Sequence, residues 1–139
     1  MAKLTAKQRQ MYREFTCEHT FCWACGVEPG QCHLLMSPDY WRHLECAHII
    51  GGSGRVADRR AICRLCKLCH DLNHGCRIVV DGKALPNLKL SHMLWLKHRH
   101  DGPVDRKFLT SLSVSAILPR SAPPPKWFKD SYTTIRGVY

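Results

Sequence analysis

The spacing of apolar positions predicts a small α+β domain. Met11, Tyr12 and Phe15 fall on one face of a helix, which predicts an N-terminal helix. Thr5 stands three residues before Gln8, the spacing of a capping box at the start of this helix. Short apolar stretches at 42–50 and 61–65, joined through a glycine-rich loop, predict two antiparallel strands, and residues 67–75 predict a helix that follows them directly.

The second half of the chain predicts an extension of this unit. Asp81-Gly82 lies between two short β-prone runs, which is typical of a tight hairpin. Apolar residues at helical spacing predict helices over 87–100 and 105–113, and four prolines between positions 119 and 125 predict a tail or strap. We expect the following organisation: an N-terminal helix (1–16), a core (17–76), a hairpin and helical extension (77–115), and a Pro-rich tail with basic and aromatic residues (116–139).

Composition adds a strong positive charge to this picture. The 139 residues include 21 Lys and Arg against 11 Asp and Glu, a formal net charge of +10. Such an excess on a small domain favours a polyanionic partner. No apolar run approaches the roughly 18 residues of a membrane helix, and the polar, basic start does not resemble a signal peptide. We therefore expect an intracellular, cytoplasmic protein with no membrane partner, whose nine cysteines are reduced.

Two pairs of cysteines have the spacing of zinc ligands. Cys22 and Cys25 form one CxxC turn, and Cys66 and Cys69 form another. Four thiolates close the tetrahedral shell of Zn²⁺, so the spacing predicts a structural zinc site without an open position. Cys63 and Cys66 also have CxxC spacing, which leaves an alternative second pair. A second zinc site stays open for the remaining candidates, which are Cys17, Cys32, Cys46, Cys63, Cys76, His19 and His33.

Three histidines form a second group of candidate ligands. His70 and His74 stand four residues apart, so they share one face of the predicted helix and could bind one ion. His48 ends the first predicted strand, and the strand–loop–strand–helix path would bring it opposite this pair. A histidine there could take a proton from water while a divalent ion stabilises charge on a phosphate.

These residues resemble the signature of the HNH endonucleases. The matching segments are Leu44-Glu45-Cys46-Ala47-His48-Ile49-Ile50 and Leu65-Cys66-Lys67-Leu68-Cys69-His70. The resemblance implies a zinc-stapled ββα-metal domain (HNH, treble-clef-like) that hydrolyses DNA phosphodiesters, on one strand as a nickase or on both. It implies His48 as general base, His70 and His74 as ligands of the catalytic ion, and Cys22, Cys25, Cys66 and Cys69 as ligands of the structural zinc.

The chain departs from the HNH pattern at two positions. Ala47 stands where many members have a metal ligand, and Ala61 stands where they have an asparagine that orients the base. Asp58 is the candidate replacement ligand. Without a carboxylate, two imidazoles favour Mn²⁺, Ni²⁺ or Zn²⁺ as the catalytic ion, whereas participation of Asp58 favours Mg²⁺.

Basic residues predict the DNA-binding surface. Most lie close together around the second strand, where they would contact phosphates of double-stranded DNA without reading its sequence. Trp127, Phe128 and Tyr132 could stack on bases or fill an apolar groove of the domain itself. Two other functions stay open, a non-catalytic zinc-dependent DNA-binding module and a zinc domain that binds proteins. The predicted phosphate contacts are Arg55, Arg59, Arg60, Arg64 and Lys67.

Overall fold

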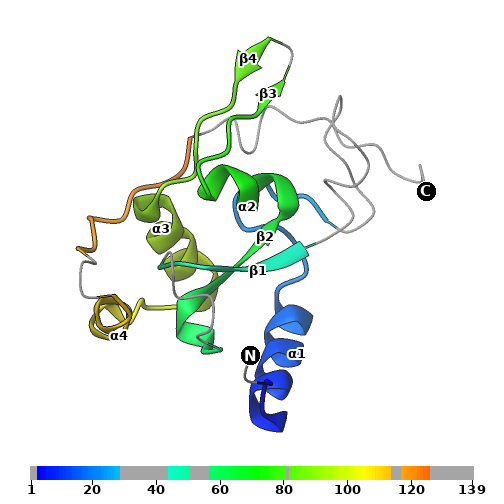
Figure 1. Ribbon diagram of the computed structural model, residues 1–139, viewed down its shortest axis with the longest axis vertical. Coiled ribbons are helices and arrows are strands. Elements are labelled where there is room, and N and C mark those ends of the chain that lie inside the picture. The colour runs from blue at the N-terminus through cyan, green and yellow to red at the C-terminus, as the bar shows by residue number, and fades with distance from the viewer. Residues whose placement is uncertain (1–2, 29–43, 51–56, 81, 114–116, 126–139) are drawn as a thin grey trace.

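The fold of this chain is α+β, with two small sheets and helices on either side (Figure 1). The computed structural model describes residues 3–28, 44–50, 57–80, 82–113 and 117–125. Within these ranges the elements are α1 (Ala6–Glu18), β1 (Leu44–His48), η2 (Arg59–Ala61), β2 (Ile62–Cys66), α2 (Lys67–Asn73), β3 (Val79–Val80), β4 (Lys83–Ala84), α3 (Leu90–Asp101) and α4 (Arg106–Ser111).

Helix α1 begins as the capping box predicts. The Gln8 backbone N–H donates to Thr5 Oγ1 at 3.1 Å, and the Thr5 backbone N–H donates to Gln8 Oε1 at 2.9 Å. These two bonds satisfy donors that a helix N-terminus otherwise leaves unpaired. Phe15 is fully buried, and Met11 and Tyr12 pack partly against the core, so the predicted apolar face is confirmed.

Strands β1 and β2 pair in antiparallel register, as predicted. The pairing runs from Leu44 opposite Cys66 to His48 opposite Ile62, so each strand places one end beside the start of α2. Helix α2 follows β2 without a loop, because Cys66 ends the strand and is also the N-cap of the helix. Gly75 has φ +83°, a left-handed conformation that ends the helix where the sequence predicts. This path places the Leu44–Cys66 end of the sheet at the start of α2.

The β3–β4 hairpin and α3 also agree with the sequence prediction. Gly82 has φ +75° in the turn between the two strands, each of which has two residues. Helix α3 begins three residues later than predicted, because residues 87–89 are an extended connection in which Leu88 is buried. Figure 1 shows the hairpin projecting beyond α2, at the opposite end of the molecule from α1.

Lys97 is buried although it begins a run of four basic residues, 97–100. Its side chain is only 4% exposed. Its Nζ donates to the Arg59 and Ile62 carbonyls at 2.6 and 2.9 Å and to Asp101 Oδ2 at 2.7 Å. The burial of a lysine requires such partners, because an unpaired buried ammonium is costly. Lys97 therefore holds α3 against η2 and β2.

Arg59 joins the same network from the other side. Its guanidinium donates twice to Asp101, at 2.6 and 3.2 Å, and also to Glu18 at the end of α1. Burial alone would raise the pKa of Asp101, but the hydrogen bonds from Arg59 and Lys97 outweigh it and hold the pKa at about 2. A lowered pKa means that the carboxylate stabilises the fold at neutral pH, and that this contribution declines only as the pH falls from about 4 to about 2.

Asp101→Asn is therefore expected to destabilise the protein at pH 7. It leaves Lys97 and Arg59 without their shared negative charge, and the expected loss is about 2–4 kcal/mol in the free energy of unfolding. Glu18→Gln is the matched control, since it removes the other carboxylate from Arg59 but at a side chain that is 53% exposed. Urea unfolding at pH 7 measures the free energy of unfolding of both variants. If both lost the same amount, Asp101 would contribute no more to stability than the exposed Glu18.

The Pro-rich segment lies on the helical extension as a strap. The Ala122 backbone N–H donates to the Ser91 carbonyl at 3.2 Å, and Arg106 Nη1 donates to the Pro119 carbonyl at 3.0 Å. The predicted contacts of Trp127, Phe128 and Tyr132 lie outside the described residues. Among the helices that the structure describes, none has the length and apolar character required to cross a membrane.

Candidate functional site

The four cysteines of the two predicted CxxC pairs meet in one buried cluster. The Sγ atoms of Cys22, Cys25, Cys66 and Cys69 all lie within 4.8 Å of one another. Each cysteine is at most 1% exposed. The structure thus selects Cys66 and Cys69 as the second pair over Cys63 and Cys66. The cluster joins the turn after α1, the end of β2 and the first turn of α2.

The chemistry of this cluster fits a divalent cation. Burial raises the pKa of the Cys25 and Cys69 thiols well above the usual range. Burial acts in the same direction on Cys22, but hydrogen bonds from its three neighbours outweigh it and lower the pKa of that thiol. Without a cation, the cluster therefore favours a negative charge on Cys22, while Cys25 and Cys69 keep their protons. A Zn²⁺ ion would supply the positive charge that stabilises all four sulfurs as thiolates. The cluster could hold a structural zinc.

The other described cysteines do not gather into a second metal site. Cys63 is fully buried with its Sγ 3.7 Å from the Met93 carbonyl, and burial raises its pKa to about 12. Cys46 lies beside Arg64, while Cys17 and Cys76 are exposed. His19 instead faces Asp101 at 3.4 Å within the Arg59 network. Cys32 and His33, the remaining candidates for a second zinc, lie outside the described residues.

His70 and His74 form a pair that could chelate an ion. His70 lies in α2 and His74 is its C-cap residue, and their Nε2 atoms are 3.0 Å apart. This is the length of a hydrogen bond between the two rings, and it is close to the separation of about 3.0–3.4 Å between two nitrogens that bind one ion at about 2.1 Å. The i, i+4 spacing has thus brought two imidazole nitrogens to a distance at which they could share one cation.

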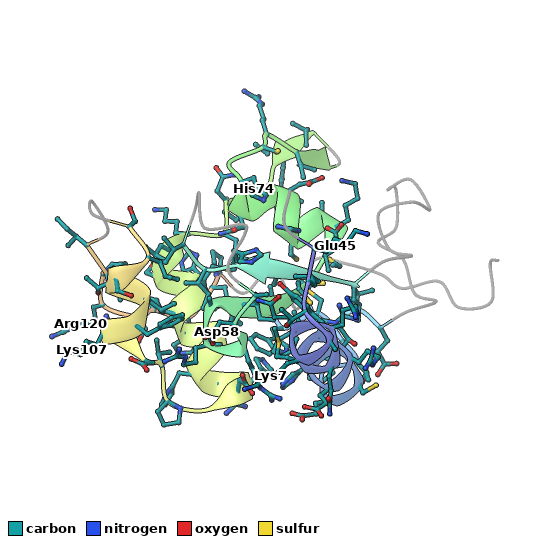
Figure 2. The ribbon with its side chains drawn as sticks, turned by 60° about the horizontal axis from the view of Figure 1, so that its bottom comes forward. Lys7, Glu45, Asp58, His74, Lys107 and Arg120 are labelled. Carbon is teal, nitrogen blue, oxygen red and sulfur yellow. The ribbon has the colours of Figure 1, made fainter. Side chains whose placement is uncertain are left out.

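Glu45 contacts His70 of this pair, and no role was predicted for it. Its Oε1 lies 3.0 Å from His70 Nδ1. A carboxylate that accepts the Nδ1–H of a histidine fixes the tautomer in which Nε2 carries a lone pair for a metal. Figure 2 shows Glu45 and His74 at the same end of the molecule, around α2. The signal available in the sequence was its position in the first strand of the HNH-like segment, three residues before His48.

The three candidate histidines line one groove with a volume of about 690 Å³. We call it the histidine groove, and its walls come from the end of β1, from α2 and from the connection into α3. His48 is half-buried at the end of β1, and it lines the same groove as the His70–His74 pair. The other polar side chains that line the groove are Asn73, Asn87 and Lys89.

Asp58 lies elsewhere and has another role. Its carboxylate accepts the Arg60 backbone N–H at 2.9 Å, which caps η2, and also pairs with the Arg60 guanidinium at 2.8 Å. It does not line the histidine groove, and Figure 2 places it apart from His74 and Glu45. Ala47 and Ala61 are both fully buried. Neither Asp58 nor Glu45 lines the groove, and Glu45 is linked to it only through its contact with His70.

The predicted phosphate contacts mostly have partners within the protein. Arg59 pairs with Asp101 and Glu18, Arg60 with Asp58 and Asp105, and Lys67 with Asp71. Arg64 donates to the carbonyls of His19 and Leu44, so it braces the start of β1. Arg55 lies outside the described residues. These pairings reduce the positive charge that the surface around β2 offers to a polyanion.

Comparisons of this chain with models of protein families, with curated proteins and with solved structures find no match.

Proposed function

We propose that this protein is a metal-dependent endonuclease of the HNH type that hydrolyses phosphodiester bonds of DNA. The observation that carries the proposal is the His70–His74 pair, with Nε2 atoms 3.0 Å apart, in the same groove as His48 and next to a buried four-cysteine cluster. A charge of +10 adds the expected attraction to a nucleic acid. The HNH-like segments of the sequence supply the reaction type.

Each histidine then has a distinct task. His70 and His74 would hold a divalent ion, with His70 oriented by Glu45. When bound, such an ion supplies a Lewis acid that stabilises negative charge on a phosphate oxygen. His48 would accept a proton from the attacking water, for which its position in the groove is suited. The cysteine cluster would keep β2 and α2 in place, and with them both metal-binding histidines.

The ligand set favours a transition metal over Mg²⁺. The His70–His74 pair offers two imidazole nitrogens, and the carboxylate beside the pair, Glu45, bonds to His70 Nδ1 and does not line the groove. Imidazole suits Zn²⁺, Ni²⁺ and Mn²⁺ better than Mg²⁺, which prefers oxygen ligands. Because Asp58 is paired with Arg60, the argument for Mg²⁺ through Asp58 loses its support.

A second candidate function is a zinc-dependent DNA-binding module without catalysis. Ala47, fully buried where HNH enzymes often have a ligand, favours this alternative. The cysteine cluster and the basic charge would suffice for binding alone. The two functions differ in whether DNA is cut.

Incubation of supercoiled plasmid with the full-length protein tests the proposal. We expect nicking or linearisation with Mn²⁺ or Ni²⁺, little with Mg²⁺, and a loss of at least about a hundredfold in rate in His48→Ala, since a general base contributes that much or more. His98→Ala is the matched control, because His98 is exposed on α3 and does not line the groove. Intact plasmid that is retarded on a gel under every metal condition would instead support the binding module.

A further inference from the structure

The β3–β4 hairpin is attached rigidly to the end of α2 that carries the histidine pair. Asn87 Nδ2 donates to the carbonyls of Leu72 and Cys76, both at 3.1 Å. Asn73 Nδ2 donates to the Leu88 carbonyl at 3.0 Å, and the Leu88 N–H donates to the Leu72 carbonyl at 3.2 Å. These four hydrogen bonds join the C-terminal end of α2 and the segment after it to residues 87–88, which follow the hairpin. The hairpin therefore has a fixed direction relative to the histidine groove.

The base of the hairpin is anchored in the core, whereas its far part is exposed. Ile78 is 9% exposed, and its carbonyl accepts the Leu85 N–H at 2.8 Å. This hydrogen bond extends the pairing of the two strands by one step at the base of the hairpin. Beyond this hydrogen bond Val79 is 49% exposed, and Gly82, Lys83 and Ala84 are exposed as well. A single exposed apolar side chain is common on protein surfaces, so Val79 supports a contact surface only together with the charge on the same hairpin.

Positive charge lies along this hairpin and at its base. Arg77 precedes β3, Lys83 begins β4, and Lys89 lines the histidine groove. All three are exposed, and within the described part of the chain no carboxylate forms an ion pair with any of them. This differs from Arg59, Arg60 and Lys67, whose charges are compensated by neighbouring carboxylates. Lys89 thus brings an uncompensated charge to the groove, and Arg77 and Lys83 extend such charge onto the hairpin that projects beyond α2.

We propose that the β3–β4 hairpin is an arm that follows a groove of double-stranded DNA and positions the duplex over the histidine groove. Arg77 and Lys83 contact phosphates, while Val79 lies against the floor or wall of the DNA groove. A two-stranded β-ribbon has the dimensions to enter the major groove of B-DNA. Because side chains alternate along a strand, Lys83 lies on the opposite face of the ribbon from Val79 and its partner Ala84, which distributes contacts over both faces. The inference rests on the proposed function for its substrate.

The test compares two double variants that remove the same charge. Arg77→Ala/Lys83→Ala changes the hairpin, and Lys107→Ala/Arg120→Ala changes two exposed cations on the far side of the molecule (Figure 2). Binding of a fluorescent DNA duplex is measured by anisotropy at several salt concentrations, without added Mn²⁺, so that the result does not depend on cleavage. We expect the hairpin variant to bind about tenfold more weakly at 0.1 M salt and to lose about two units of the log–log salt slope, since each phosphate contact contributes about one.

The control variant is expected to change the affinity less than about threefold, because its cations lie away from the arm. A third variant, Val79→Asp, leaves every cation in place and is also expected to weaken duplex binding, by placing a negative charge against the phosphates. Equal losses of affinity in the two double variants, or unchanged binding by Val79→Asp, would contradict the proposal that the hairpin binds duplex DNA. The proposal would also be contradicted if the wild-type protein bound single-stranded DNA as tightly as duplex DNA. Failure of the nuclease proposal appears separately, as absent hydrolysis of plasmid by a wild type whose duplex binding still depends on the hairpin.

Discussion

Replacing Cys66 by serine is expected to release one tightly bound zinc per chain and to unfold the protein. Cys66 ends β2, caps α2 and is fully buried among the other three sulfurs of the cluster. A serine hydroxyl does not replace a thiolate on Zn²⁺ at neutral pH. Structural zinc in small domains contributes about 10–16 kcal/mol to folding. That contribution is as large as the whole stability of most domains, about 5–15 kcal/mol, so the variant is expected to have no folded state without metal.

Cys63→Ser is the matched control for this prediction. Cys63 is equally buried and has CxxC spacing to Cys66, but its Sγ lies against the Met93 carbonyl and not in the cluster. We expect this variant to retain its zinc and its fold, with a loss of about 1–2 kcal/mol for a hydroxyl in an apolar site. Elemental analysis of zinc and far-UV circular dichroism measure both effects. A folded Cys66→Ser protein that keeps one zinc, or a folded wild type without zinc, would contradict the role of the cluster.

The second large effect is expected from His70→Ala and His74→Ala. Each removes one of two imidazole nitrogens that lie 3.0 Å apart, and a single imidazole holds a divalent ion only weakly. Both variants are expected to lose Mn²⁺-dependent plasmid cleavage by at least about a thousandfold, because the ion's stabilisation of phosphate charge is worth several kcal/mol. They are expected to keep their structural zinc and their fold, since neither side chain belongs to the cysteine cluster.

Glu45→Gln separates orientation from ligation within the same site. The amide can still meet His70 Nδ1 but does not carry the negative charge that stabilises its N–H, and such outer partners typically change metal affinity by 10–100-fold. We therefore expect a weaker Mn²⁺ response that is restored at higher Mn²⁺ concentration, whereas His70→Ala is not restored. Titration of plasmid cleavage against Mn²⁺ measures this difference. A loss in Glu45→Gln that excess Mn²⁺ does not rescue would show that Glu45 does more than orient His70.

Much of the fold followed from local patterns. The Thr5–Gln8 capping box, the left-handed Gly75 and Gly82 and the two paired strands all occur where the sequence predicts them. The capping box depends on residues close in sequence, and the two turns depend on a conformation that glycine adopts more readily than other residues. The pairing of the strands joins more distant residues, but their two short apolar stretches indicated it. The start of α3 was less predictable, because a buried Leu88 in an extended connection has the same apolar spacing as a helix turn.

The partners of charged side chains were the least predictable feature. Arg59 was predicted to contact phosphate, yet it binds Asp101, which is 42 residues away along the chain and also binds the buried Lys97. Asp58 was expected at the catalytic ion but pairs with Arg60, two residues away. A charge gives the same signal in a sequence whether it faces water, phosphate or a buried carboxylate, because its environment depends on which elements pack around it.

The sequence by itself determined the helices and strands, the two CxxC turns and the i, i+4 pair of histidines, because these depend on spacing within one element. Only the tertiary structure decided that Cys66 and Cys69 complete the cluster with Cys22 and Cys25, that Glu45 bonds to His70, and that Lys89 lines the histidine groove. These contacts join segments that are far apart along the chain or on different elements. Their distances are set by how β1, β2 and α2 pack, which no local pattern encodes.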